Sequence, residues 1–247
     1  PELLAILRSN LGERPRVCLF DIGRVMYPSD ELLPDELRRL GIVMAGDREP
    51  SSWHAAEQPL IDFFDLKGVL EALFRRLGVQ RNVTWAASED RRFHPGRSAE
   101  LQLSDGRTLG IAGELHPATR ERLDLDIARV CAAEIDLDLL YSLIEPAQYE
   151  PIIRQPAAYQ DIAVIVADDL PAEQVRTLIE SNAGAMIERV ELFDVYSGAP
   201  IPAGQRSLAF RMVFRAANRT LEDAEISKIR EKIARRLQSD LGATVRV

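Results

Sequence analysis

The spacing of apolar residues changes along the chain, and these changes outline the predicted elements. Apolar positions three and four apart predict helices, whereas alternation of apolar and polar residues predicts strands. Helices are predicted over residues 2–10, 62–77, 117–123, 136–144, 171–181 and 224–241. Strands are predicted over residues 17–27, 40–44, 83–85, 98–103, 109–115, 130–135, 161–166, 189–193, 208–214 and 245–247.

Turn and cap signals set the ends of several elements. Asp105-Gly106 lies between two alternating runs and predicts a tight hairpin. Gly78 is a suitable C-cap for the helix before it, and Asp62 or Asp65 can serve as that helix's N-cap. The stretch Thr220–Asp223 resembles a capping box at the start of the last helix.

The order of the elements predicts an α+β protein with two domains. Residues 146–156 hold three prolines and little periodicity, so we expect the boundary there, between domains 1–150 and 151–247. The first domain is interpreted as an antiparallel sheet with helices packed against it. The second follows the order β-α-β-β-α-β, which is typical of a ferredoxin-like fold.

Charge separates the two predicted domains. The net charge is −8, yet residues 152–247 hold 13 Lys and Arg and 13 Asp and Glu, so the excess falls on the first part. That acidic part is poorly suited to bind a phosphate backbone, whereas the neutral part can present a local basic face.

Composition is that of a soluble globular protein, and we expect a cytoplasmic location. No apolar run approaches the roughly 20 residues needed to span a bilayer, and no signal sequence is recognised. Because Pro1 leads straight into a helical pattern, we expect the chain to be a piece of a longer protein. Cys18 and Cys131 lie in apolar runs, so both are expected to be reduced and buried.

The segment 192–210 holds the candidate binding residues. It predicts a strand, a turn rich in Gly and Pro, and a returning strand. Alternation places Asp194 and Tyr196 on one face at the end of the first strand, and Ser207 opens the second. An aromatic ring beside two hydrogen-bonding groups suits a flat polar ligand such as an unstacked RNA base. A purely structural tyrosine is the alternative.

An RNA loop also requires cations for its phosphates, and four arginines lie in the returning strand and after it. They are Arg206, Arg211, Arg215 and Arg219. A solvated face is the alternative for each of them. Asp194 is compatible with RNA if it accepts hydrogen bonds from a guanine edge, which carries N–H donors.

Other kinds of site are also considered for the first domain. His54, His94 and His116 with Glu100 and Glu114 can be drawn as a metal or acid–base cluster, but their spacing matches no metal signature. His-Pro pairs more often serve turns and caps, and no phosphate-binding or nucleophile-elbow motif occurs. The amphipathic helix 65–77 and the first helix also allow a subunit-assembly role.

Five motifs in order identify a resemblance. The chain resembles the C-terminal part of bacterial-type phenylalanyl-tRNA synthetase beta subunits over nearly its whole length. The motifs are Leu19–Val25 (LFDIGRV), Asp62–Gly68 (DFFDLKG), Phe93–Ala99 (FHPGRSA), Gly113–Pro117 (GELHP) and the hairpin 192–210 through Arg219-Thr220-Leu221.

The resemblance implies the fold and function of both domains. The first would resemble a class II synthetase domain that has lost catalysis and packs against the alpha subunit, which binds ATP and Mg in the whole ligase. The second would be a ferredoxin-fold anticodon-binding domain for phenylalanine tRNA, in a heterotetramer of two alpha and two beta subunits. No catalytic residue, cofactor, metal or membrane contact is expected in this chain, although a retained small-molecule pocket is the alternative.

Residue roles carry over to the hairpin. By the resemblance, Tyr196 would stack on the first anticodon base, with Asp194 and Ser207 as hydrogen-bonding neighbours. The chain departs from the family pattern at Gln160, where Arg is expected, and at Arg206, where Lys is expected. Both departures leave the fold intact but could change a phosphate contact. Arg206 is the fourth predicted RNA-binding residue, beside Tyr196, Asp194 and Ser207.

Overall fold

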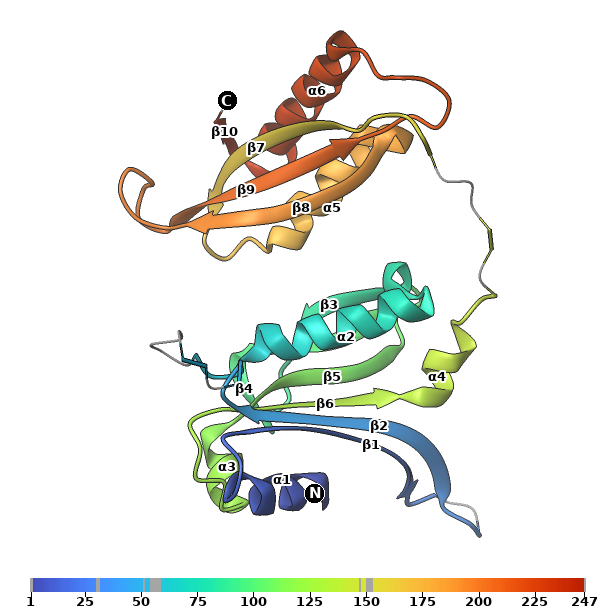
Figure 1. Cartoon of the computed structure of the whole chain (residues 1–247), viewed down its shortest axis with the longest axis vertical. Helices are drawn as coiled ribbons and strands as arrows, with labels where there is room; N and C mark the ends of the chain where they lie inside the picture. Colours follow the sequence, from blue (N-terminus) through green and yellow to red (C-terminus); the bar gives the residue numbers. More distant parts are fainter. Residues whose placement is uncertain are drawn as a thin grey trace. The chain divides into compact units, whose positions relative to one another are not determined.

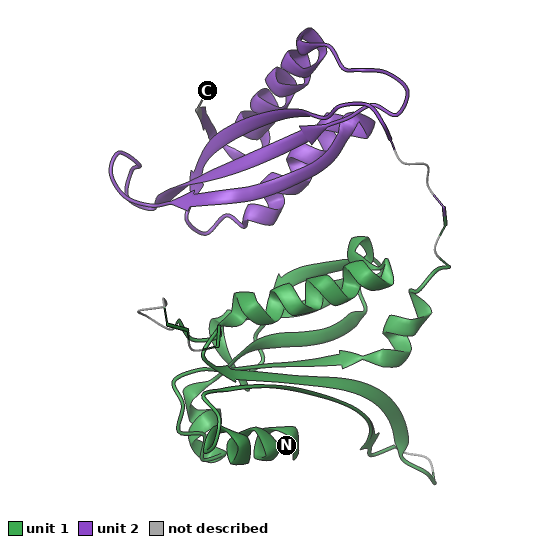
Figure 2. Ribbon diagram, viewed as in Figure 1, with its two compact units in different colours: residues 1–148 green, residues 149–247 purple. Residues whose placement is uncertain are grey.

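The chain forms two compact units, residues 1–148 and 149–247 (Figure 2). A computed structural model describes residues 2–29, 32–50, 52–53, 59–146, 148–149 and 153–246. His54 and the other residues between these ranges lie outside the described part. Each unit has its own sheet and core (Figure 1), so each is described by itself.

Unit 1 is built on a six-stranded antiparallel sheet in the order β1-β2-β6-β5-β4-β3. The long strands β1 and β2 form a hairpin at one edge of the sheet and pair over twelve residues without a shift of register. The strands are β1 Arg16–Tyr27, β2 Asp35–Gly46, β3 Val83–Ala87, β4 Phe93–Leu103, β5 Thr108–Leu115 and β6 Val130–Asp136.

Helices lie on both faces of this sheet (Figure 1). One core lies under α2 and α4 and includes Leu66, Phe74 and Ile135. The other lies under α1 and includes Leu7 and Val17. The elements are α1 Glu2–Leu11, α2 Phe63–Leu77, η1 Gln80–Asn82, α3 Pro117–Arg122 and α4 Leu137–Ser142.

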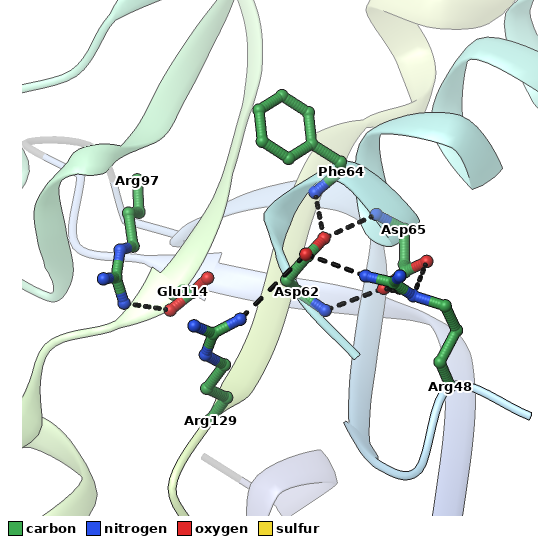
Figure 3. A network of polar contacts seen from close by, with 7 residues as sticks. All are labelled: Arg48, Asp62, Phe64, Asp65, Arg97, Glu114 and Arg129. Atoms are coloured by element: carbon green, nitrogen blue, oxygen red, sulfur yellow. Dashed lines mark hydrogen bonds and ion pairs between the residues drawn. The ribbon is translucent and has the colours of Figure 1, made fainter. Parts of the chain in front are cut away.

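The start of α2 is fixed by a capping box and an ion-pair network (Figure 3). The Asp62 carboxylate accepts from the backbone N–H of Phe64 at 2.8 Å, and Asp65 accepts from the backbone N–H of Asp62 at 2.8 Å. Arg48 bridges both carboxylates, at 2.8 Å to Asp62 and 2.9 Å to Asp65. Two acidic groups at a helix N-terminus are also favoured by the helix dipole.

Glu114 on β5 is the one charged residue that is buried among the described residues, at 5% exposure. Its carboxylate pairs with Arg97 of β4 at 3.0 Å, and Arg97 is half exposed (Figure 3). A buried carboxylate without a partner is costly, so this contact stabilises the pairing of β4 with β5.

Unit 2 is a four-stranded antiparallel sheet in the order β10-β7-β9-β8, with two helices. The elements are β7 Ala158–Ala167, α5 Ala172–Ala183, η2 Gly184–Met186, β8 Ile187–Tyr196, β9 Gln205–Phe214, α6 Asp223–Leu241 and β10 Thr244–Arg246. This order confirms the predicted βαββαβ arrangement, and the two antiparallel sheets confirm the α+β class.

Both helices of unit 2 pack on the same face of its sheet (Figure 1). The core consists of alternate residues of β7 and β9, such as Val164 and Phe210, against Ile179 of α5 and Ile233 of α6. The intervening residues of these strands therefore point to the opposite face, which no helix of the unit covers. We call it the open face.

Two sequence predictions need correction. The predicted burial of Cys18 is wrong: it is exposed, because β1 is an edge strand and α2 lies over β5 and β6. Cys131 is buried as predicted, and burial raises the pKa of its thiol. The last helix is capped by Glu222 instead of Thr220, because Glu225 accepts from the backbone N–H of Glu222 at 3.1 Å.

In the part of the chain that the structure describes, every helix is too short or too polar to cross a bilayer.

Gly110 is predicted to be required for the pairing of β5 with β6. A Cβ at Gly110 would lie 2.3 Å from the Glu134 carbonyl oxygen, so Gly110→Ala should lower the free energy of unfolding by roughly 1–3 kcal/mol. Urea unfolding followed by tryptophan fluorescence measures it, since both tryptophans, Trp53 and Trp85, lie in unit 1.

Gly68→Ala is the matched control. Gly68 lies in α2, and apart from its own turn of helix no described atom lies within 4 Å of an added Cβ, so this variant should gain up to about 1 kcal/mol from helix propensity. Equal stability of the two alanine variants would contradict the close approach at Gly110.

The Arg97–Glu114 pair is predicted to couple strongly. Arg97→Ala leaves the carboxylate buried and unpaired, so it should cost about 1–3 kcal/mol of unit 1 stability. In a Glu114→Gln background the same change should cost less than half as much, because the buried charge is gone. A double-mutant cycle by urea unfolding measures this difference. Additive effects of the two changes would show that the pair contributes nothing.

Candidate nucleic-acid interface

One extra residue in β8 sets the geometry of the candidate site. Leu192 pairs with Phe210 and Asp194 pairs with Ala209, so Phe193 has no counterpart on β9 and forms a β-bulge. A bulge changes which face the following side chains reach. As a result Tyr196 pairs with Ser207. The preceding residue, Val195, pairs with Leu208, which points into the core. Tyr196, Asp194 and Ser207 therefore share the open face.

The Tyr196 ring is held in place at the end of β8. It is 47% exposed, and its hydroxyl donates to the carbonyl oxygen of Ala199 at 2.7 Å. The loop that makes this contact turns at Gly198, whose φ of +124° is one that other residues rarely adopt. Buried Ile201, whose N–H bonds to the Gly198 carbonyl at 2.8 Å, anchors the same loop. The ring is thus ordered before any ligand binds.

The two polar neighbours of Tyr196 keep their hydrogen-bonding capacity. Asp194 is exposed and Ser207 is half-buried. Within the described ranges, no side-chain hydrogen bond or ion pair engages the Asp194 carboxylate or the Ser207 hydroxyl. The structure therefore brings together an ordered ring, a carboxylate acceptor and a hydroxyl on one exposed face.

Arg206 is not brought to this group. It precedes Ser207 in β9 and pairs with Val166, a core residue, so its side chain lies on the helix-covered side of the sheet. Its guanidinium donates to the Leu170 carbonyl oxygen at 2.9 Å, while its Nε is buried without a partner among the described atoms. The structure thus places Arg206 on the opposite side of the sheet from Tyr196.

The other three predicted arginines are engaged in ion pairs. Arg211 pairs with Asp161 at 2.8 Å, Arg215 with Glu188 at 2.5 Å and Arg219 with Glu225 at 2.6 Å. The Arg219 pair and the Glu222 N–H lower the pKa of Glu225 to about 2. Arg215 and Arg219 also follow the end of β9 that is distant from Tyr196, where Phe214 pairs with Ile187. Stacking and base-edge contacts therefore carry more of any affinity at Tyr196.

Sequence reasoning missed Phe193 and Tyr159. Phe193 is 53% exposed and lies under the guanidinium of Arg211, 5.1 Å from the ring centroid. Alternation alone would put Phe193 on the face opposite Tyr196, and only the bulge brings both to the open face. Tyr159 could have been found, since it alternates with the core residues of β7 and is exposed.

The histidine cluster considered for unit 1 does not form among the described residues. His116 is the N-cap of α3 and accepts from the Ala118 N–H at 3.1 Å. His94 contacts the Pro95 carbonyl, and Glu114 is occupied by Arg97. The described residues contain no group of three His, Cys, Asp or Glu placed to hold a metal ion.

Comparison with known proteins assigns both units. Residues 1–137 match the family model described as the phenylalanyl tRNA synthetase beta chain CLM domain. Residues 154–246 match the model described as the ferredoxin-fold anticodon binding domain. The second match agrees with the strand order of unit 2.

Curated relatives match over the whole chain. The chain is 40% identical over 249 residues to a phenylalanine–tRNA ligase beta subunit from Symbiobacterium thermophilum, covering 100% of this chain and 27% of the relative. It is 40% identical to the protein of that name from Moorella thermoacetica over 250 residues, covering 100% of this chain and 30% of the relative. The chain thus spans about 30% of the length of these relatives.

The two domain matches occur in the order in which the two units follow each other, and the first covers more than half of the chain. The chain therefore belongs to the phenylalanyl-tRNA synthetase beta-chain family.

Proposed function

We propose that unit 2 binds the anticodon loop of phenylalanine tRNA through Tyr196, Asp194 and Ser207. The observation that carries this proposal is their common placement on the open face, with Tyr196 directly opposite Ser207. The match of this unit to anticodon-binding domains supports an RNA ligand. In the whole protein this binding would serve the ATP-dependent attachment of phenylalanine to tRNA.

Each residue has a distinct chemical role in the proposed complex. The exposed Tyr196 ring offers a surface on which an unstacked base can lie. The Asp194 carboxylate accepts from the N–H donors of a guanine, and the Ser207 hydroxyl can donate or accept at a second edge atom. A guanine at the first anticodon position matches this set better than adenine, because guanine offers the adjacent donors N1–H and N2–H2 to the two carboxylate oxygens, whereas adenine offers N6–H2 beside the acceptor N1. Arg206 is left out of this contact set because its guanidinium is on the other side of the sheet.

Unit 1 is proposed to contact the alpha subunit instead of catalysing a reaction. Its edge strand β1 exposes Phe20, Ile22 and Met26, which alternate on the same face of the strand. An exposed apolar stripe of this kind is typical of a protein–protein contact. ATP and Mg would be bound by the alpha subunit, in an assembly of two alpha and two beta subunits. A role in assembly with little RNA binding is the second candidate function.

Tyr196→Ala should weaken binding of the anticodon stem-loop of phenylalanine tRNA by roughly 1–3 kcal/mol, the usual effect of losing one base–aromatic stack. Fluorescence titration of the whole chain with labelled RNA measures it at two salt concentrations, because phosphate contacts alone are salt-dependent. Val195→Ala is the matched control, since Val195 is equally exposed on the same strand but points to the other face.

A stem-loop with a changed first anticodon base separates readout from general RNA affinity. The wild-type chain should prefer the unchanged loop, and Tyr196→Ala should lose that preference. Equal binding of Tyr196→Ala and wild type would refute the assignment of Tyr196. Failure to bind either loop would favour the assembly role.

The apolar stripe is tested by co-elution with the alpha subunit. Phe20→Ser with Ile22→Ser should abolish co-elution in size-exclusion chromatography while leaving the stem-loop affinity unchanged. Unaltered co-elution would exclude this strand from the subunit contact.

A further inference from the structure

We infer that Phe193 and Arg211 form a second base-stacking position on the open face of unit 2, for the nucleotide adjacent to the base on Tyr196. The inference rests on the proposed function and adds a second nucleotide to the same site. It starts from an exposed phenylalanine that contributes nothing to the core of the unit.

The geometry of this position is ordered by three side chains. The Arg211 guanidinium lies 5.1 Å from the Phe193 ring centroid. Its Nε and Nη2 donate to the two carboxylate oxygens of Asp161, at 2.9 and 2.8 Å. This two-point contact fixes the plane of the guanidinium and leaves the phenylalanine ring half exposed. A base can stack on an aromatic ring or on a guanidinium plane, and both are present here.

The charge of this group favours stacking over a phosphate contact. Asp161 neutralises Arg211, and the hydrogen bond from Arg211 lowers the pKa of the Asp161 carboxyl, so the pair stays ionised at neutral pH. The carboxylate offsets the positive potential of the guanidinium and occupies its Nε and Nη2 donors, which weakens its attraction for a phosphate. The position should therefore add affinity that depends only weakly on salt.

The spacing requires two bases instead of one. Phe193 and Tyr196 are three residues apart on β8, which corresponds to about 10 Å along a strand. Stacked aromatic groups have centroids about 4.5–7 Å apart, so one base cannot stack on both rings. A ferredoxin-like sheet can offer separate aromatic positions to successive bases of a single strand. Tyr159, exposed on the same face and two residues from Asp161, continues this surface.

The test is titration of the whole chain with labelled anticodon stem-loops. Phe193→Ala should weaken binding roughly 5- to 150-fold, with the same salt dependence as wild type. Phe193→Tyr keeps a ring at the bulge and should bind within about twofold of wild type. Thermal unfolding of each variant shows whether the bulge and the fold are retained.

Abasic loops identify the nucleotide. One stem-loop lacks the base before the first anticodon position and a second lacks the base after it. Wild type and Phe193→Ala should bind one of these two loops with equal affinity, because that loop lacks the base that stacks on Phe193. A full effect of Phe193→Ala on both abasic loops would overturn the stacking assignment, as would a changed salt dependence.

Tyr196→Ala separates this inference from the proposed function. If Tyr196→Ala weakens binding and Phe193→Ala does not, the second position is absent and the first remains. If neither variant weakens binding, both proposals fail.

Discussion

Strand β8 carries one residue more than its partner β9 can pair, and the candidate site depends on this mismatch. Without the bulge at Phe193, Val195 would lie opposite Ser207 and Tyr196 would face the helices. The extra residue also leaves Phe193 on the same face as Asp194. A single local irregularity in backbone pairing thus determines which side chains a ligand can reach.

The packing of unit 2 makes this face available. Both helices bury alternate residues of β7 and β9 on one side, and the other side carries Tyr159, Ser207 and Arg211 among aliphatic residues such as Ala163 and Ala209. The predicted arginines in and after β9 are paired with carboxylates or a backbone carbonyl. The surface is therefore better suited to base recognition than to general attraction of phosphates, which is consistent with the neutral charge of this part of the chain.

Unit 1 uses its polar groups to hold its own fold. Arg48 links the two aspartates of the α2 cap, Arg97 neutralises the buried Glu114, and His116 caps α3. These paired polar side chains stabilise the fold of the unit. Gly110 and Gly113 allow the neighbouring strands of its sheet to approach closely. The exposed stripe on β1 lies outside the cores of the unit.

The element order and the α+β class follow from the sequence alone, and the sequence also predicts Tyr196, Asp194 and Ser207 as one group. These follow from local signals: apolar periodicity, turn residues and short motifs. The exposure of Cys18, the side on which Arg206 lies and the placement of Phe193 on the open face come only from the tertiary structure. Each depends on strand order or on a register shift, and these are set by pairing with residues distant in the chain, which a local pattern does not contain.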